Sequence, residues 1–133
     1  MKLIIFTDGG SRGNPGPAGI GAIIYNDKKE TVATVSKFLG VATNNQAEYK
    51  AIIAALHKAK ELGGTELDFF MDSELAVKQI NREYKVKNKD LAPLFLDINN
   101  LSLSFKKLTF THVRREYNKE ADRLANEAMD KSY

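Results

Sequence analysis

The sequence predicts an α/β fold in which a mixed five-stranded sheet is flanked by helices. Three short apolar runs, Leu3–Phe6, Leu67–Met71 and Leu108–Val113, are bounded by turn residues and have the length of buried strands. Two β-rich runs follow the first of them, and segments with helical signals separate the later ones. Three early strands followed by alternating helices and strands favour a mixed sheet with helices on its faces.

The N-terminal part is expected to form three antiparallel strands. The first, Leu3–Phe6, is followed by Asp8 and by a loop dense in glycine, asparagine and proline. Ile20–Tyr25 and Thr31–Phe38 are joined by Asn26–Lys29, a pattern typical of a hairpin. The mixed polarity of the third run favours a place at the outside of the sheet.

Helix signals surround the later strands. Thr43 and Gln46 have the spacing of a capping box, so we expect a helix from there to Leu62, where Gly63 and Gly64 supply a left-handed end. Further helices are expected at Ser73–Arg82, at Leu91–Leu103, and from a capping Asn118 to Met129.

Length and composition are those of one globular domain, residues 1–133. Of the 133 residues, 43% are hydrophobic and 28% are charged, which suits a single core. The net charge of +3 is compatible with a nucleic-acid partner without indicating one. The absence of cysteine excludes disulfides, thiolate catalysis and zinc ribbons. With no signal peptide and no membrane-spanning run, we expect a cytoplasmic protein without a membrane partner, and a monomer by default.

Four acids lie where the predicted elements begin or end. Asp8 and Asp72 each follow an apolar strand, and Asp122 lies in the first turn of the last helix. Taken singly, each has a commoner structural use, as a turn residue, a helix cap or a partner of the helix dipole. Glu48 differs, because it lies near the start of a helix on its apolar face, where solvation explains it poorly.

As a set, these acids predict a metal site. Open α/β sheets form their ligand crevices at strand ends, and carboxylates gathered there repel each other unless cations bind. Oxygen ligands without cysteine or an obligatory histidine favour Mg²⁺ or Mn²⁺. Two such ions a few ångströms apart suit in-line displacement at phosphorus.

Four segments in order, TDGGSRGNPGPAGIGA, TNNQAEYKAI, MDSELAV and NKEADRLAN, resemble the type 1 ribonuclease H family, and the similarity extends over essentially the whole chain. The resemblance implies the ribonuclease H-like fold and endonucleolytic hydrolysis of the RNA strand of RNA/DNA hybrids, leaving 5′-phosphate and 3′-hydroxyl ends. It also implies that Asp8, Glu48, Asp72 and Asp122 are catalytic and jointly hold two Mg²⁺ ions with substrate, with Mn²⁺ as a substitute.

The resemblance gives substrate-binding roles to nearby polar residues. Asn14, Asn45 and Gln46 match positions that contact 2′-hydroxyls or base edges, Asn44 lies beside them, and Thr43 matches a DNA-phosphate contact. Amide side chains both donate to and accept from a 2′-hydroxyl, the group that distinguishes RNA from DNA. For Thr43 and Asn44, helix capping is the structural alternative, and both uses are compatible.

The chain departs from the family pattern before the last helix. Family members often carry a histidine in a flexible loop there, whereas residues 113–118 are short and lack one. The assisting role is therefore vacant, or it is taken by Glu116 or by water. We interpret His112 as structural and His57 as solvated.

A second departure lies between the two middle helices. Longer relatives have a basic handle there, whereas this chain has Lys85, Lys87 and Lys89 in a short segment. Phosphate contacts and an ordinary solvated loop are equally compatible with these lysines, and activity on RNA/RNA duplexes also stays open. The alternatives to a nuclease are a non-catalytic module that binds hybrids or double-stranded RNA, and a phosphoryl-transfer enzyme. The glycine-rich loop lacks the ending of a P-loop, which disfavours the latter.

Overall fold

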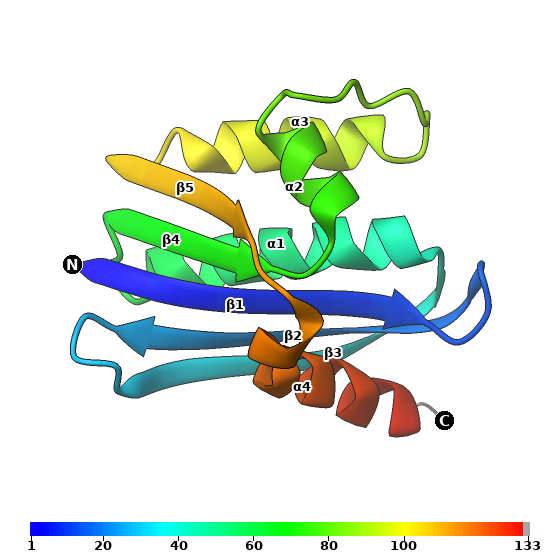
Figure 1. Ribbon diagram of the computed structural model, residues 1–133, viewed down its shortest axis with the longest axis horizontal. Helices are drawn as coiled ribbons and strands as arrows, with labels where there is room; N and C mark the ends of the chain where they lie inside the picture. Colours follow the sequence, from blue (N-terminus) through cyan, green and yellow to red (C-terminus); the bar gives the residue numbers. More distant parts are fainter. Residues whose placement is uncertain (132–133) are drawn as a thin grey trace.

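The computed structural model describes residues 1–131 and contains one five-stranded mixed sheet in the order β3-β2-β1-β4-β5. The strands are β1 (Lys2–Ser11), β2 (Gly16–Asn26), β3 (Thr31–Ala42), β4 (Glu66–Met71) and β5 (Lys107–His112). The pairs β1–β2 and β2–β3 are antiparallel, whereas β1–β4 and β4–β5 are parallel. The predicted mixed sheet is therefore confirmed (Figure 1).

Helices lie on both faces of this sheet. They are α1 (Asn44–Glu61), α2 (Glu74–Ile80), α3 (Ala92–Ser102) and α4 (Lys119–Asp130), with a short 3-10 turn, η1 (Arg115–Tyr117), before α4. The helices α1 and α3 lie on one side of the sheet, and α4 packs on the other against β1, β2 and β3 (Figure 1). Within residues 1–131, no helix is both long and apolar enough to cross a membrane.

The first three strands are longer than the sequence predicts. Antiparallel pairing between β1 and β2 continues through Asp8 opposite Gly21 to Ser11 opposite Ala18. Asp8 therefore lies inside β1, and the loop after it shrinks to residues 12–15. Backbone pairing extends over these glycine-rich residues because both strands present free hydrogen-bonding groups, although the side chains have little β preference.

The main core lies between the sheet and α1. Alternate residues of β1, Leu3 and Ile5, are fully buried on this side. The hydroxyl of Tyr49 on α1 donates to Gln79 Oε1 on α2 at 2.6 Å, so a buried polar contact also joins these helices. Other large buried side chains here are Ile24, Ile52, Leu56, Leu67, Phe69, Leu91 and Ile98.

Candidate active site

Side chains from four different elements surround one pocket of about 450 Å³. Asp8 comes from β1, Glu48 from α1, Asp72 from the residue after β4, and Asp122 from the first turn of α4. The structure thus brings together all four acids that the sequence singled out. The first and the last of these acids, Asp8 and Asp122, are 114 positions apart in the sequence, so only the fold brings them close together.

Two glycines permit the close packing that brings the acids together. A Cβ on Gly9 would overlap the backbone of Ala47, so the missing side chain lets α1 start against β1 with Glu48 beside the pocket. Gly21 pairs with Asp8 across the sheet, and a Cβ there would overlap the carbonyl of Ala121 in α4. Both helices approach the sheet where a larger residue would push them away.

The clustered carboxylates resist ionising together. Burial first, and then the charge of Asp72, contact with Asp122 and the charge of Glu48, raise the pKa of Asp8 to about 8. Burial also raises the pKa of Glu48 to about 7, although a hydrogen bond with Ser73 acts in the opposite direction. A bound cation would oppose both effects because it stabilises the charged carboxylates.

The donor set fits a hard divalent cation, but it is not a preformed cage. Within the part of the chain that the structure describes, no three acidic or histidine side chains are grouped so that they could hold a metal ion by themselves. Mg²⁺ usually takes one or two protein carboxylates and completes its shell with water and substrate phosphates. Carboxylates arranged around an open pocket therefore suit Mg²⁺, and the joint binding of two ions by the four acids stays a prediction.

Asp72 and its neighbours correct two of the expected helix caps. The cap of α2 is Ser73, whose Oγ accepts from the Ala76 amide at 3.2 Å, so Asp72 is not used as a cap. Asn118 precedes α4, but its side chain makes no capping hydrogen bond, contrary to the prediction. Its Nδ2 instead donates to the Thr7 carbonyl at 2.9 Å and to Asp72 Oδ1 at 3.3 Å.

The predicted capping box at the start of α1 is confirmed. The Gln46 amide donates to Thr43 Oγ1 at 3.1 Å, and the Thr43 amide donates to Gln46 Oε1 at 2.9 Å. The Gln46 oxygen is thus engaged, and its NH₂ group is what it can offer a ligand. The substrate-binding roles of Thr43 and Gln46 stay predictions.

The other predicted substrate residues lie beside this box. Asn14 Oδ1 accepts from the Asn44 amide at 3.1 Å, and Asn44 Oδ1 accepts from the Ser11 amide at 2.8 Å. These bonds tie the loop after β1 to the start of α1, and Asn44 lines the acidic pocket. Asn14 and Asn45 do not line it, and the contacts predicted for Asn14, Asn44 and Asn45 also stay predictions.

Sequence reasoning missed several polar residues of the pocket, among them Arg115. The sequence feature that could have indicated Arg115 is the pair Arg114 and Arg115 in the segment that lacks a histidine. Glu116, unlike Arg115, lines a separate pocket, and its Oε1 lies 3.7 Å from Nη1 of Arg114. His112 ends β5 and is exposed, contrary to its interpretation as structural, whereas the exposure of His57 is confirmed. The other polar lining residues that were missed are Ser11, Arg12, Ser73 and Asn126.

Comparison with known proteins agrees with this architecture. Residues 6–128 match the family described as "Reverse transcriptase-like". A bifunctional protein of Mycobacterium tuberculosis is 48% identical over 131 residues, which are 98% of this chain and 36% of that protein. The chain therefore spans about a third of the length of such relatives. RNase H1 of the archaeon Halobacterium salinarum superposes with a TM-score of 0.97 at 39% identity, covering 99% of this chain and all of that one.

The chain belongs to the type 1 ribonuclease H family. The resemblance, the ribonuclease H-like fold and the expectation of a ribonuclease H are thereby confirmed at the level of the family, whose members use divalent metal ions. A ribonuclease H isolated from compost, LC11-RNase H1, was solved in complex with an RNA/DNA hybrid. That structure matches with a TM-score of 0.93 at 45% identity and 97% coverage of both chains.

Proposed function

We propose that this chain is an endonuclease that hydrolyses the RNA strand of RNA/DNA hybrids and leaves 5′-phosphate and 3′-hydroxyl ends. The observation that carries the proposal is the convergence of Asp8, Glu48, Asp72 and Asp122, from four elements, on one pocket. Membership of the ribonuclease H family and the hybrid bound to LC11-RNase H1 support the choice of substrate. Nucleic acid is therefore the proposed partner.

The proposed cofactor is Mg²⁺, two ions with substrate, with Mn²⁺ as a substitute. The four carboxylates are the residues that would hold these ions. Bound ions of this kind lower the pKa of water and offset negative charge at the reacting phosphate. The carboxylates would hold the ions in place, and the raised pKa values of Asp8 and Glu48 show that these two acids resist ionisation when no cation is bound.

Residues around the acids would bind the sugar and phosphate groups of the substrate. Asn44 lines the pocket, and its backbone amide donates to Asn14 Oδ1, which holds Asn14 beside it outside the lining. The side-chain NH₂ groups of both residues suit a ribose 2′-hydroxyl. Arg115 provides a guanidinium beside the acids, which suits a backbone phosphate. An RNA strand lying between these groups would place a phosphodiester over the carboxylates.

Cleavage of labelled duplexes tests the proposal. RNA/DNA, RNA/RNA and DNA/DNA duplexes are incubated with Mg²⁺, with Mn²⁺ or with chelator, using the wild type, Asp72→Asn and the control Asp97→Asn. Asp97 is an exposed acid on α3 that does not line the site. We expect metal-dependent cutting of the RNA strand of the hybrid by the wild type and Asp97→Asn only.

Three other results of the cleavage assay would change the substrate or the assignment. Additional cutting of RNA/RNA would keep the site and widen its substrate. A folded wild type that binds the hybrid but cuts nothing with either ion would contradict the proposal and leave a non-catalytic binding module. Equal cutting by Asp72→Asn would contradict the assignment of the acids.

A further inference from the structure

We propose that Asn118 is a positioning residue of this site, whose side-chain amide holds Asp72 in place relative to the strand that carries Asp8. The inference rests on the proposed function for its effect on cleavage. Its effects on cation binding and on the Asp72 hydrogen bond do not depend on that function.

The buried amide of Asn118 connects two acid-bearing segments. The residue is only 1% exposed. Its Nδ2 donates to the carbonyl of Thr7, the residue before Asp8, at 2.9 Å, and to Asp72 Oδ1 at 3.3 Å. One NH₂ group therefore uses its two donors on β1 and on the carboxylate that follows β4.

This bridge lies where the two central strands stop pairing. The parallel ladder between β1 and β4 ends at Phe6 opposite Phe70. One residue further along, the Met71 carbonyl accepts from the Val113 amide at 2.9 Å, and the Thr7 carbonyl accepts from Asn118. Beyond the end of the ladder, Asn118 is thus the side chain that joins β1 to the segment carrying Asp72.

The same residue also connects to the fourth acid. The backbone carbonyl of Asn118 accepts from the Asp122 amide at 3.1 Å, in the first turn of α4. Asn118 is therefore hydrogen-bonded to segments that carry three of the four acids, Asp8, Asp72 and Asp122. A displacement of its side chain would change the spacing of Asp72 relative to both Asp8 and Asp122.

Helix capping does not explain an asparagine here. Its side chain makes no capping hydrogen bond, although capping is the usual use of this residue type before a helix. Its Oδ1 is buried and has no hydrogen-bond partner among the described residues, which opposes folding. An apolar side chain would avoid this cost, so the donated bonds to Thr7 and Asp72 are what asparagine contributes. Groups that orient metal ligands typically affect affinity or activity by about 10-fold to 100-fold.

The first test compares Asn118→Ala with Ile98→Ala. Ile98 is a buried α3 residue outside the pocket, so its truncation lowers stability without touching the site. Calorimetric titration of the metal-free proteins gives Mg²⁺ affinity, and steady-state kinetics gives kcat and KM for a hybrid. We expect Asn118→Ala to weaken Mg²⁺ binding about 10-fold and to lower kcat at least 10-fold, with KM changed less than about 3-fold. Ile98→Ala keeps wild-type affinity and kcat.

The second test uses no change at position 118 and so is independent of whether Asn118→Ala folds. In NMR spectra of the metal-free protein, we expect Asp72→Ala to shift the side-chain amide resonances of Asn118, and Asp97→Ala to leave them in place. Unmoved resonances in Asp72→Ala would overturn the proposal, as would wild-type Mg²⁺ affinity in folded Asn118→Ala. A wild type that cleaves no hybrid would instead refute the proposed function while leaving these two readouts to decide the inference.

Discussion

Asp8 lies inside a strand and faces three other carboxylates, and these surroundings govern its chemistry. Burial and the neighbouring acids raise its pKa to about 8, far above the ordinary value of 3.8. An uncharged residue at this position would make β1 more stable, because it would avoid the burial of a charge. The carboxylate is therefore a source of instability in the metal-free protein, and a bound cation would offset it.

Asp8→Asn is expected to stabilise the metal-free protein at high pH. The folded pKa lies above the unfolded one, so ionisation costs stability as the pH rises from about 4 to about 8. At about pH 9 the variant should gain roughly 2–4 kcal/mol over the wild type, and the gap should close toward pH 4. Thermal unfolding with chelator, followed by circular dichroism, measures this difference. A pH-independent gap would contradict the account.

Glu116→Gln is expected to leave the cleavage rate within about twofold of the wild type. The sequence left open whether Glu116 replaces the missing loop histidine, but its side chain lines a pocket other than the one with the four acids. Single-turnover cleavage of a hybrid measures the rate. A loss of tenfold or more would place Glu116 in the mechanism after all.

At this scale the sequence predicted the four acids and missed their supporting partners. The acids could be found because each lies at the boundary of a predicted element and the four motifs occur in order. The direction of the Asn118 side chain could not, since capping is the commoner use of asparagine before a helix. Its actual partners, Thr7 and Asp72, are distant in sequence and are determined by the end of the β1–β4 ladder.

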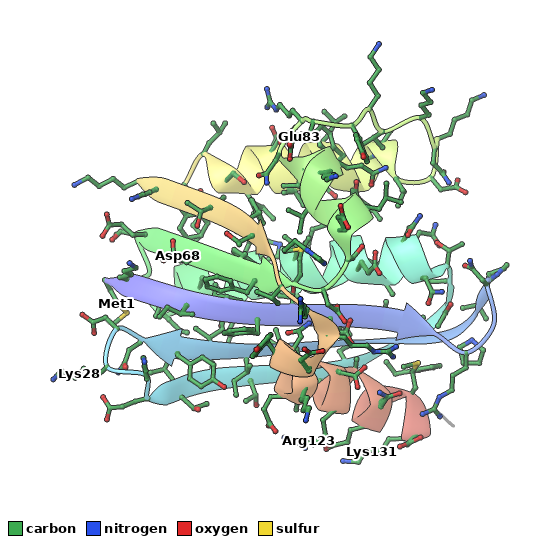
Figure 2. All side chains as sticks on the ribbon, viewed as in Figure 1. Met1, Lys28, Asp68, Glu83, Arg123 and Lys131 are labelled. Carbon is green, nitrogen blue, oxygen red and sulfur yellow. The ribbon has the colours of Figure 1, made fainter. Side chains whose placement is uncertain are left out.

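Among the elements, the packing of α4 on β2 is what brings Asp122 to the pocket. The helix lies close to the strand because Gly21 has no side chain, and Ser36 Oγ of β3 donates to the Leu124 carbonyl at 2.7 Å. The charged residues Arg123 and Lys131 lie on the outer side of this helix (Figure 2). The buried residues of this helix are all apolar, whereas Asp122 and Asn126 line the acidic pocket.

Gly21→Ala is expected to displace α4 and to lower both stability and cleavage. The added methyl would overlap the Ala121 carbonyl, so the helix that carries Asp122 must move, at a cost of about 1–3 kcal/mol. Ser36→Ala is the control, because it removes one hydrogen bond to α4, worth about 1 kcal/mol, without displacing the helix. Denaturant unfolding and hybrid cleavage would be measured on both. Full activity in Gly21→Ala would contradict this view of the packing.

The order of the elements was predicted correctly, whereas the bounds of the first three strands were not. Hydrophobic patterns and caps identified every strand and α-helix of the described residues, including α1 with its capping box, but not the 3-10 turn η1. The sequence ended the first strand at Phe6, although pairing with β2 carries it to Ser11. Glycine has no β preference, so pairing across the sheet extends a strand that local sequence would stop.

On the scale of the whole molecule, the loop between α2 and α3 that carries the lysines lies toward the β5 edge of the sheet, whereas α4 packs on β2 and β3 toward the other edge (Figure 1). Glu83, two residues before Lys85, lies across the molecule from Arg123 and Lys131 (Figure 2). Lys85, Lys87 and Lys89 are exposed, and Lys85 lines a groove with Arg82 and Tyr84, apart from the acidic pocket. We propose that these lysines contact backbone phosphates of a duplex that extends beyond the cleavage site.

Replacing Lys85, Lys87 and Lys89 by alanine is expected to reduce the salt dependence of hybrid binding. For every lysine that neutralises a phosphate, its replacement lowers the slope of log affinity against log salt by about one unit. Lys28→Ala is the control, since Lys28 lies in the β2–β3 turn at the far end of the sheet (Figure 2). Binding is measured with chelator at several salt concentrations. An unchanged slope would make the segment an ordinary solvated loop.

The most direct test of the central claim is the cleavage rate of one RNA/DNA hybrid by four single variants, Asp8→Asn, Glu48→Gln, Asp72→Asn and Asp122→Asn. The rates are measured at saturating Mg²⁺, with Asp97→Asn as control and folding checked by circular dichroism. If the four carboxylates act as one metal-dependent site, each substitution lowers the rate by about 10³-fold or more, and the control stays within about twofold. A folded variant of any of the four that cleaves at the wild-type rate would contradict the shared site.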